Sequence, residues 1–399
     1  MTDCSDIPKG YQKTESGGLP EDWKIVKFES AAHIIMGQSP PGTTYNETGD
    51  GKPFLQGKAE FGEVNPKNIK FTTDPKKIAP LNSILMSVRA PVGDVNIADI
   101  EYCIGRGLAA ISLEKGDNRF LFFLLQHLKD EIEKEGTGSI FKSINKAKLS
   151  GIEIPLPPLP EQHAIVHVLR TVQEAKEKTD AVIAATKALK ASMMKHLFTY
   201  GPVPREKAET VALNEEGSLR YPEHWNLGRF DNFIVLQRGF DITKDEQRDG
   251  NVPVISSSGI KSYHNTPRVK GPGVTIGRKG TLGKVFYVDC DYWPHDTSLW
   301  VKDFKGNNPK FVYYLLTTLN LKILDTGTSN PTLNRNYVHA LKIALPSLKE
   351  QGVIVDILST IDQKIAAEQS RKEALDTLFT SLLHDLMTAK IRVAPAETA

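Results

Sequence analysis

Cysteine is scarce in this sequence, and long hydrophobic runs are missing from it. The three cysteines among 399 residues, Cys4, Cys103 and Cys290, are widely separated. This spacing excludes a CxxC zinc site and a secreted disulfide framework. The densest apolar run, Phe120–Leu125, is far shorter than the roughly 20 residues that span a bilayer. Because residues 1–11 are polar, we expect no signal peptide, and the sequence predicts a cytoplasmic protein without membrane contact.

Excess charge of one sign is missing as well, because 50 lysines and arginines accompany 48 aspartates and glutamates. A uniformly basic coat for nucleic acid and an acidic disordered tail are therefore excluded, whereas a local basic patch is not. The length of 399 residues is too great for one ordinary hydrophobic core. We expect several domains.

Catalytic motifs are a third absence. There is no Asn/Asp-Pro-Pro-Tyr/Phe tetrapeptide and no Phe-x-Gly-x-Gly loop of an amino-methyltransferase. Gly277–Lys284 is similar to a phosphate-binding loop, but its glycine spacing is one residue too long, and Val285 replaces the magnesium-binding hydroxyl. His163 and His167 have a spacing that could hold a metal on a helix, but a solvent-facing pair explains it better. We predict no catalytic residue, no metal site and no cofactor in this chain.

An internal repeat is the main feature that is present. Ile154–Gln162 reads IPLPPLPEQ and matches Ile343–Gln351, IALPSLKEQ, 189 residues later. Near the front of each half, Leu19–Trp23 (LPEDW) matches Tyr221–Trp225 (YPEHW) at a spacing of 202 residues. Chance is a poor explanation for matches that recur in the same order. The sequence therefore indicates a duplicated unit whose middle part has diverged.

Each half begins with short strand-like runs between glycines and prolines and ends with a long helix. Apolar residues from Ile165 to Met193 and from Ile354 to Leu386 follow alternating spacings of three and four, which predict a narrow seam for one partner helix. A helix over 161–198 would be about 57 Å long at 1.5 Å per residue. We expect the two helices to pair antiparallel. Two separate helices, each packed on its own domain, are the alternative.

The predicted fold class is α+β, with two similar globular domains separated by a long antiparallel two-helix coiled coil in a pseudo-twofold, cyclic internal repeat. We expect the first globular domain over 1–155, the first spacer helix over 156–201, the second globular domain over 202–343, the second spacer helix over 344–390 and a disordered tail over 391–399.

A basic segment without acidic residues lies in the second globular domain. Asn251–Val288 contains no Asp or Glu and carries several lysines and arginines among serines and glycines. Such a composition suits phosphate contacts and hydrogen bonds to base edges. Solvated lysines in turns are the plainer alternative.

A polar loop precedes the proline-rich bend in both halves and changes its residues while keeping its polarity. It lies within Gly136–Ile152 in the first half and within Ser329–Asn336 in the second. Such variation would suit a surface that reads different sequences. The candidate DNA-binding residues are Arg89, Arg106, Lys142, Ser143, Asn145 and Lys146 in the first half, and Lys261, Tyr263, Arg278, Lys279, Asn334, Arg335 and Asn336 in the second.

These features together resemble the specificity (S) subunits of type I restriction–modification systems. The resemblance covers roughly residues 9–390. The segments that carry it are Gly18–Trp23, the turn Arg89–Gly93, Thr137–Asn145 and Ile154–Gln162, repeated as one unit. One departure is that Arg278–Gly283 answers Arg89–Gly93 with a one-residue gap, so identical contacts by the two arginines are not expected.

The resemblance implies that each globular domain is a target recognition domain that reads one half of a split site in double-stranded DNA, with the helices setting the gap. It implies as partners two modification (methyltransferase) subunits and the restriction (translocase) subunits. S-adenosylmethionine, ATP and Mg are then expected on those partners only, and this chain would be non-catalytic. A non-enzymatic interaction scaffold or anti-restriction decoy without DNA specificity, and an enzyme with unrecognised active residues, are the alternatives.

Overall fold

The computed structural model describes residues 10–14, 17–67, 70–136, 143–207, 211–213, 220–327 and 331–394. The chain forms two compact units. The first combines the chain up to Thr179 with the chain from Arg371 onward, and the second is Asp180–Ser370. Two long helices, α5 (Leu159–Tyr200) and α9 (Leu348–Met387), contribute residues to both units.

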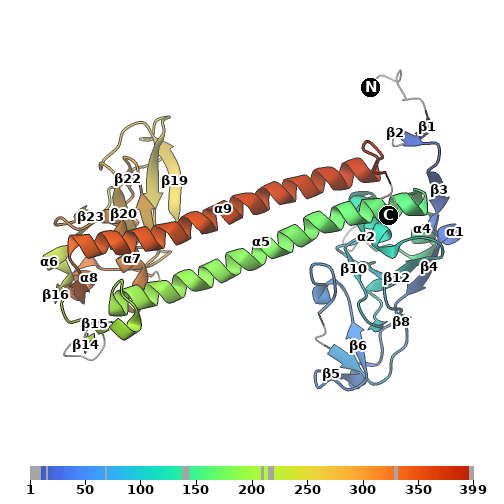
Figure 1. Ribbon diagram of the computed structural model, residues 1–399, viewed down its shortest axis with the longest axis horizontal. Helices are drawn as coiled ribbons and strands as arrows, with labels where there is room; N and C mark the ends of the chain where they lie inside the picture. Colours follow the sequence, from blue (N-terminus) through green and yellow to red (C-terminus); the bar gives the residue numbers. More distant parts are fainter. Residues whose placement is uncertain are drawn as a thin grey trace. The chain divides into compact units, whose positions relative to one another are not determined.

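The first unit contains a four-stranded antiparallel sheet and a five-stranded mixed sheet (Figure 1). The four-stranded sheet has the order β10 (Val95–Ile97), β9 (Ile84–Ser87), β12 (Leu108–Leu113) and β4 (Ala32–Met36). The five-stranded sheet has the order β5 (Tyr45–Asn46), β7 (Lys70–Thr72), β6 (Lys52–Leu55), β11 (Tyr102–Ile104) and β8 (Ile78–Ala79).

Two strand pairs and several short helices complete the first unit. The pairs are β1 (Tyr11–Thr14) with β2 (Gly17–Pro20), and β3 (Lys24–Lys27) with β13 (Glu153–Leu156). The helices are α1 (Phe28–Ala31), α2 (Asn118–His127), α3 (Lys129–Glu135), α4 (Lys146–Gly151) and the 3₁₀ turns η1 (Gly42–Thr44) and η2 (Lys58–Glu60).

The second unit repeats this plan with a four-stranded antiparallel sheet and a three-stranded sheet. The first has the order β17 (Val235–Arg238), β23 (Ser298–Asp303), β20 (Gly273–Gly277) and β21 (Val285–Val288). The second has the order β19 (Gly259–His264), β18 (Val252–Ser256) and β22 (Trp293–Pro294).

Two strand pairs and several short helices complete the second unit as well. They are the pairs β14 (Val211–Leu213) with β15 (Arg220–Pro222) and β16 (Asn226–Arg229) with β24 (Lys342–Leu345), the helices α6 (Phe230–Phe233), α7 (Pro309–Thr318) and α8 (Arg335–Ala340), and the 3₁₀ turns η3 (Arg205–Lys207) and η4 (Leu321–Leu324). The predicted α+β fold with an internal repeat is confirmed.

Helices α2 and α7 cover the four-stranded sheets and supply much of each core. The apolar run Phe120–Leu125 that the sequence analysis noted is fully buried within α2. Asp117 and Asn308 cap the two helices, each accepting a hydrogen bond from a main-chain N–H of the first turn. Burial of this apolar surface is the main force that fixes each unit.

Helices α5 and α9 pair with each other, as the apolar spacing predicts, and they run antiparallel, as we expect for two helices connected through a whole globular domain. In the first unit, Lys176 Nζ lies 2.6 Å from Asp376 Oδ1. In the second, Lys190 Nζ lies 2.6 Å from Asp362 Oδ1. The residue numbers rise along one helix and fall along the other, which gives the antiparallel direction. The 42 residues of α5 correspond to a length of about 63 Å.

The duplicated Glu-Gln motif joins each long helix to its sheet domain. Trp23 Nε1 donates to Glu161 Oε2 at 3.1 Å, and Trp225 Nε1 donates to Glu350 Oε1 at 2.9 Å. The neighbouring Gln162 accepts from the main-chain N–H of Asp117 at 2.9 Å, and the same arrangement recurs in the second unit. The repeated motifs are therefore structural joints, which explains why they changed least between the halves.

Arg392 lies in the segment 391–399, for which the sequence predicts a disordered tail. Its guanidinium is instead fixed by two carboxylates of the first unit, Glu161 at 2.6 Å and Asp22 at 2.7 Å. Hydrogen bonds to these carboxylates raise the pKa of Arg392. Residues 395–399 lie outside the described part of the chain.

None of the helices in the described ranges combines the length and the apolar character that a membrane crossing requires.

Candidate nucleic-acid interface

Predicted site residues of the first unit meet where β9 ends. The main-chain N–H of Val88 donates to Gly107 O at 2.9 Å, which places Arg106 beside this turn. Ile144 N donates to Val88 O at 3.0 Å, and Arg89 forms an isolated β-bridge with Ser143. The structure thus brings together Arg89, Arg106 and the start of the polar loop at Ser143.

The second unit has the same arrangement where β20 ends. Arg278 N donates to Thr297 O at 2.9 Å, and Leu333 N donates to Arg278 O at 2.9 Å. Lys279 forms an isolated β-bridge with Thr332. Arg278 and Lys279 therefore adjoin the loop that continues into the predicted residues Asn334, Arg335 and Asn336 (the last two open α8).

Main-chain hydrogen bonds correct the alignment of the two turns. Ser87 N donates to Asp94 O, and Ser87 O accepts from Gly93 N. In the same way, Gly277 N donates to Lys284 O, and Gly277 O accepts from Gly283 N. The two turns therefore have equal length, and the one-residue gap expected from the sequence is wrong. Lys279 is the counterpart of Arg89, and Val88 is the counterpart of Arg278. The expectation of different contacts by Arg89 and Arg278 agrees with this pairing.

Three further hydrogen bonds place the neighbouring strands identically in both units. In the first unit the main-chain N–H groups donate to carbonyl oxygens as follows: Gly37 to Leu108, Gln38 to Ile104 and Gly105 to Leu55. In the second unit the corresponding bonds are Gly239 to Ser298, Phe240 to Pro294 and His295 to Ile255. Strand pairing adds that Met36 and Arg238 hold equivalent positions. We call these equivalent positions the variable corner: Met36, Val88, Arg89, Gly105 and Arg106 in the first unit, and Arg238, Arg278, Lys279, His295 and Asp296 in the second.

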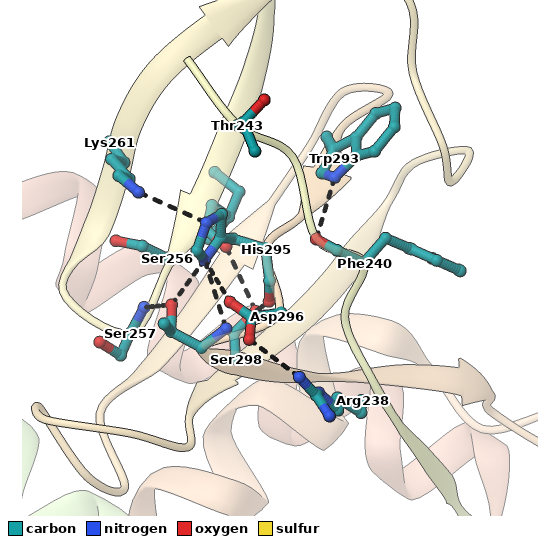
Figure 2. A network of polar contacts seen from close by, with 12 residues as sticks. Arg238, Phe240, Thr243, Ser256, Ser257, Lys261, Trp293, His295, Asp296 and Ser298 are labelled. Carbon is teal, nitrogen blue, oxygen red and sulfur yellow. Dashed lines mark hydrogen bonds and ion pairs between the residues drawn. The ribbon is translucent and has the colours of Figure 1, made fainter. Parts of the chain in front are cut away.

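A network of polar contacts fills the variable corner of the second unit (Figure 2). His295 is 6% exposed, and its Nδ1 lies 3.1 Å from Asp296 Oδ1. Arg238 Nη2 donates to Asp296 Oδ2 at 3.0 Å, and Lys261 Nζ lies 3.4 Å from His295 Nε2. Burial lowers the pKa of His295, and the Lys261 ammonium acts in the same direction.

Arg278 lies beside this network with part of its guanidinium buried. Its Nη1 is covered and has no hydrogen-bond partner among the described residues. Burial lowers the pKa of Arg278, and the positive charge of Arg238 adds to the effect, whereas Asp296 opposes it. Because Asp296 forms its ion pair with Arg238, Arg278 keeps a hydrogen-bond donor that another acceptor could use.

A hollow of about 630 Å³ opens next to the network, lined by two aromatic residues, three arginines and one acidic residue, Asp241, among others. The guanidinium carbon of Arg268 lies 5.0 Å from the centre of the Phe240 ring and 5.8 Å from that of Trp293. Arg238 and the predicted residue Arg335 line the same hollow. Arginines stacked on aromatic rings beside further arginines suit a polyanionic surface.

Two of the predicted asparagines have a structural role. Asn145 Oδ1 accepts from Lys148 N at 2.9 Å, and Asn334 Oδ1 accepts from Asn336 N at 3.0 Å. These side chains cap α4 and α8. The caps use only the amide oxygens, and both asparagines are exposed. The predicted Lys146 is exposed as well.

The remaining predictions are placed less closely. Lys261 reaches the variable corner through His295, whereas Tyr263 is 54% exposed on β19 and pairs with Pro253 of β18. Lys142 lies outside the described residues. DNA contact by these residues stays a prediction.

The sequence analysis missed Arg238, His295 and Asp296. The last two lie beyond the acid-free segment 251–288 that drew attention to the second unit, and Arg238 comes from a strand well before it. The pairing of β17 with β23, which no local pattern predicts, brings them together. The spacing signal available was Gly37 against Gly239, which marks Met36 and Arg238 as equivalent.

One group of described residues has possible metal-ligand atoms within 4.8 Å of one another: Asp241, His295 and Asp296. His295 already contacts the ammonium group of Lys261, and Asp296 already forms an ion pair with Arg238. These side-chain cations supply the positive charge that a metal would bring, so the donor set does not favour a metal ion.

The family described as "Type I restriction modification DNA specificity domain" matches residues 20–184 and 222–377. The chain belongs to this family. The predicted identification as a type I specificity subunit is thereby confirmed, and the two matches coincide with the two copies of the repeat. Each copy is a target recognition domain followed by a long helix, and the family assigns the chain a role in DNA specificity.

Relatives of this specificity subunit support the same assignment. It is 51% identical over 173 residues to a putative type I restriction enzyme MjaX specificity subunit of Methanocaldococcus jannaschii, a match that covers 42% of this chain and 41% of the relative. The chain thus spans about two fifths of that relative's length. It is 21% identical over 411 residues to the MjaVIII specificity subunit of the same organism, covering 94% of both chains.

A solved structure shares the fold. The crystal structure of a type I restriction–modification S subunit from M. genitalium superposes with a TM-score of 0.62 at 19% identity, covering 91% of this chain and 96% of that one. At this identity the likeness concerns the fold alone.

Proposed function

We propose that each target recognition domain reads one half of a bipartite DNA site through its variable corner. One observation carries this proposal: the same main-chain hydrogen bonds hold different side chains in the two units. A frame made by backbone atoms keeps its geometry while the side chains that reach base edges change. Specificity of this kind depends on side-chain donors and acceptors at fixed positions.

The polar residues around each variable corner have separable roles in this proposal. Arginine and asparagine side chains discriminate bases, each bidentate contact contributing about 1–3 kcal/mol. The exposed lysines, Lys146 and Lys279 among them, bind phosphates and set affinity and its salt dependence. Arg89, Arg106 and Arg278 are the predicted arginines that lie at or beside the turns of the two variable corners.

The paired helices set the gap between the half-sites. An α-helix of 42 residues is about 63 Å long. One turn of DNA is about 34 Å. A rod of this length is long enough to separate two contacted segments of the duplex by more than one turn.

The chain has a recruiting role without chemistry of its own. We propose that two methyltransferase subunits and the restriction (translocase) subunits assemble on it and bring S-adenosylmethionine, ATP and Mg. Support comes from the family and from Arg238, His295 and Asp296, which contact one another rather than a candidate nucleophile. The scaffold or decoy alternative gains no support from the differing corners, because a scaffold has no need to vary them.

Methylome sequencing tests the proposal. A host that expresses this chain together with the methyltransferase and restriction subunits of a type I system should carry a methylated adenine on each strand of one split motif. The same host with the chain deleted should lose that motif. Methylation without a gapped motif, or unchanged methylation after deletion, would contradict the proposal and favour a scaffold.

A further inference from the structure

Three equivalent positions of the variable corner carry side chains of different charge in the two units. Met36, Val88 and Arg106 in the first unit correspond to Arg238, Arg278 and Asp296 in the second. Each set carries one net positive charge, but only the second contains a carboxylate. The two corners therefore present different patterns of donors and acceptors on one backbone frame.

Asp296 is held rigidly at this frame. One oxygen accepts from Arg238 at 3.0 Å, and the other lies 3.1 Å from His295 Nδ1 (Figure 2). The side chain remains 18% exposed. A carboxylate has about four acceptor sites, so these two neighbours leave acceptor capacity directed at solvent.

Arg278 supplies the complementary donors. Its Nη1 is buried without a partner among the described residues, and an unpaired buried donor of this kind costs stability. Asp296 is the nearest counter-charge, but Arg238 engages it. Arg278 as a whole is only half-buried, so the part of its guanidinium beyond the covered Nη1 is available to a ligand that offers two adjacent acceptors.

We infer that Arg278 and Asp296 together read one G·C pair in the half-site of the second target recognition domain, with Arg238 as the residue that positions Asp296. This inference rests on the proposed function. Guanine is the base that offers two adjacent acceptors, O6 and N7, in the major groove, and these suit the guanidinium of Arg278. Its partner cytosine presents the N4 amine, which donates to the carboxylate of Asp296.

The first unit is not expected to share this preference. Arg106 occupies the place of Asp296, and buried Val88 occupies the place of Arg278. A donor thus replaces the acceptor, and an apolar group replaces the donor. The two half-sites should differ at the base pair that faces this position.

The experiment uses the full chain assembled with its methyltransferase subunits and a DNA library with randomised half-sites. Arg278→Val introduces the first unit's residue, and Asp296→Asn keeps the shape while removing the charge. Wild type should require G·C at one position of one half-site. Each variant should reduce discrimination at that position by about 5- to 150-fold and leave the other half-site unchanged.

Lys302→Ala is the matched control, since it removes an exposed positive charge from the far end of β23 in the same unit. It should weaken methylation of all library members by a similar factor or leave it unchanged. Thermal unfolding of each variant separates misfolding from altered reading, and Asp296→Asn is the milder substitution if Arg278→Val unfolds.

Three results would overturn the inference while leaving the proposed function intact. They are a second half-site made of A·T pairs alone, folded variants with the wild-type motif, and a uniform loss on all sequences, which would make Arg278 a phosphate contact. If wild type methylates no split motif at all, the proposed function itself fails.

Discussion

At the residue scale, Glu161 shows how one buried carboxylate holds three segments of the first unit. Its side chain is 5% exposed and receives hydrogen bonds from Trp23 and Arg392. Arg392 also binds Asp22, and this hydrogen bond is the main reason that the pKa of Asp22 is lowered. A buried carboxylate keeps its charge only with such partners.

Arg392→Ala is expected to lower the free energy of unfolding of the first unit by about 1–3 kcal/mol, because Glu161 would lose its cationic partner and stay buried. Hydrogen exchange of first-unit amides measures this. Arg170→Ala is the control, since Arg170 pairs with Glu174 on an exposed helix face, and such pairs contribute about 0.3–0.5 kcal/mol. Equal effects of the two substitutions would show that the burial of Glu161 does not matter.

His295 gives a prediction about pH. Its pKa in the folded chain is below the ordinary value of 6.5, because burial disfavours the charged ring and Lys261 repels it, against the opposing charges of Asp296 and Asp241. As the pH falls below about 6.5, the unfolded chain binds a proton first, so wild type loses stability until the folded pKa is passed.

His295→Gln should remove this part of the pH dependence. The stability advantage of wild type over the variant should shrink between pH 7.5 and pH 5, by up to about 1.4 kcal/mol for each unit between the two pKa values. Urea unfolding at both pH values measures it. His339, whose pKa burial also lowers, is present in both proteins and cancels. A constant difference would contradict the assigned shift.

At the element scale, the short helix α8 allows capping to be separated from base reading. Asn334 Oδ1 caps the helix, while its NH₂ group is the part that could donate to a base. Asn334→Ala should cost about 1 kcal/mol of stability through the lost cap. Asn334→Asp should keep stability, because aspartate caps equally well, and yet lose any base contact made by the amide. If Asn334→Asp leaves the methylated motif unchanged, the residue is a cap alone.

The long helices give a prediction about spacing. Removing residues 180–186 from α5 and the facing residues 366–372 from α9 takes out two turns at 3.5 residues per turn, so the apolar seam stays in phase. The rods would shorten by about 10 Å. Methylome sequencing should then report a shorter gap with both half-sites unchanged. A seven-residue insertion at each place should lengthen it, and an unchanged gap in both variants would refute the spacer role.

The sequence predicted the elements better than the site. The helices follow from the apolar spacing that ends at Met193 and Leu386, and the internal repeat follows from the duplicated Pro-rich bend. These signals are local along the chain. The partners of Asp296 are set by strand pairing between distant segments, and residue identity misaligned Arg278 with Arg89 where hydrogen bonding pairs Lys279 with Arg89.

At the scale of the whole molecule, the two ends of the described chain meet within the first unit. The hydroxyl group of Tyr11 donates to Ala389 O at 3.1 Å. A circular permutant that joins the termini and opens the chain within 202–215 should therefore fold and direct the same methylation motif. Circular dichroism and methylome sequencing measure the two outcomes. Loss of folding even with a long joining linker would argue against the cyclic repeat.

The frame around the variable corner has a consequence for how this chain can change. Its geometry depends on peptide groups, which every residue except proline supplies alike. If Arg278 and Asp296 read bases as proposed, single codon changes at either residue would alter which DNA is methylated while the scaffold stays folded. A host population could acquire new methylation patterns by point mutation, with the methyltransferase and nuclease genes left untouched.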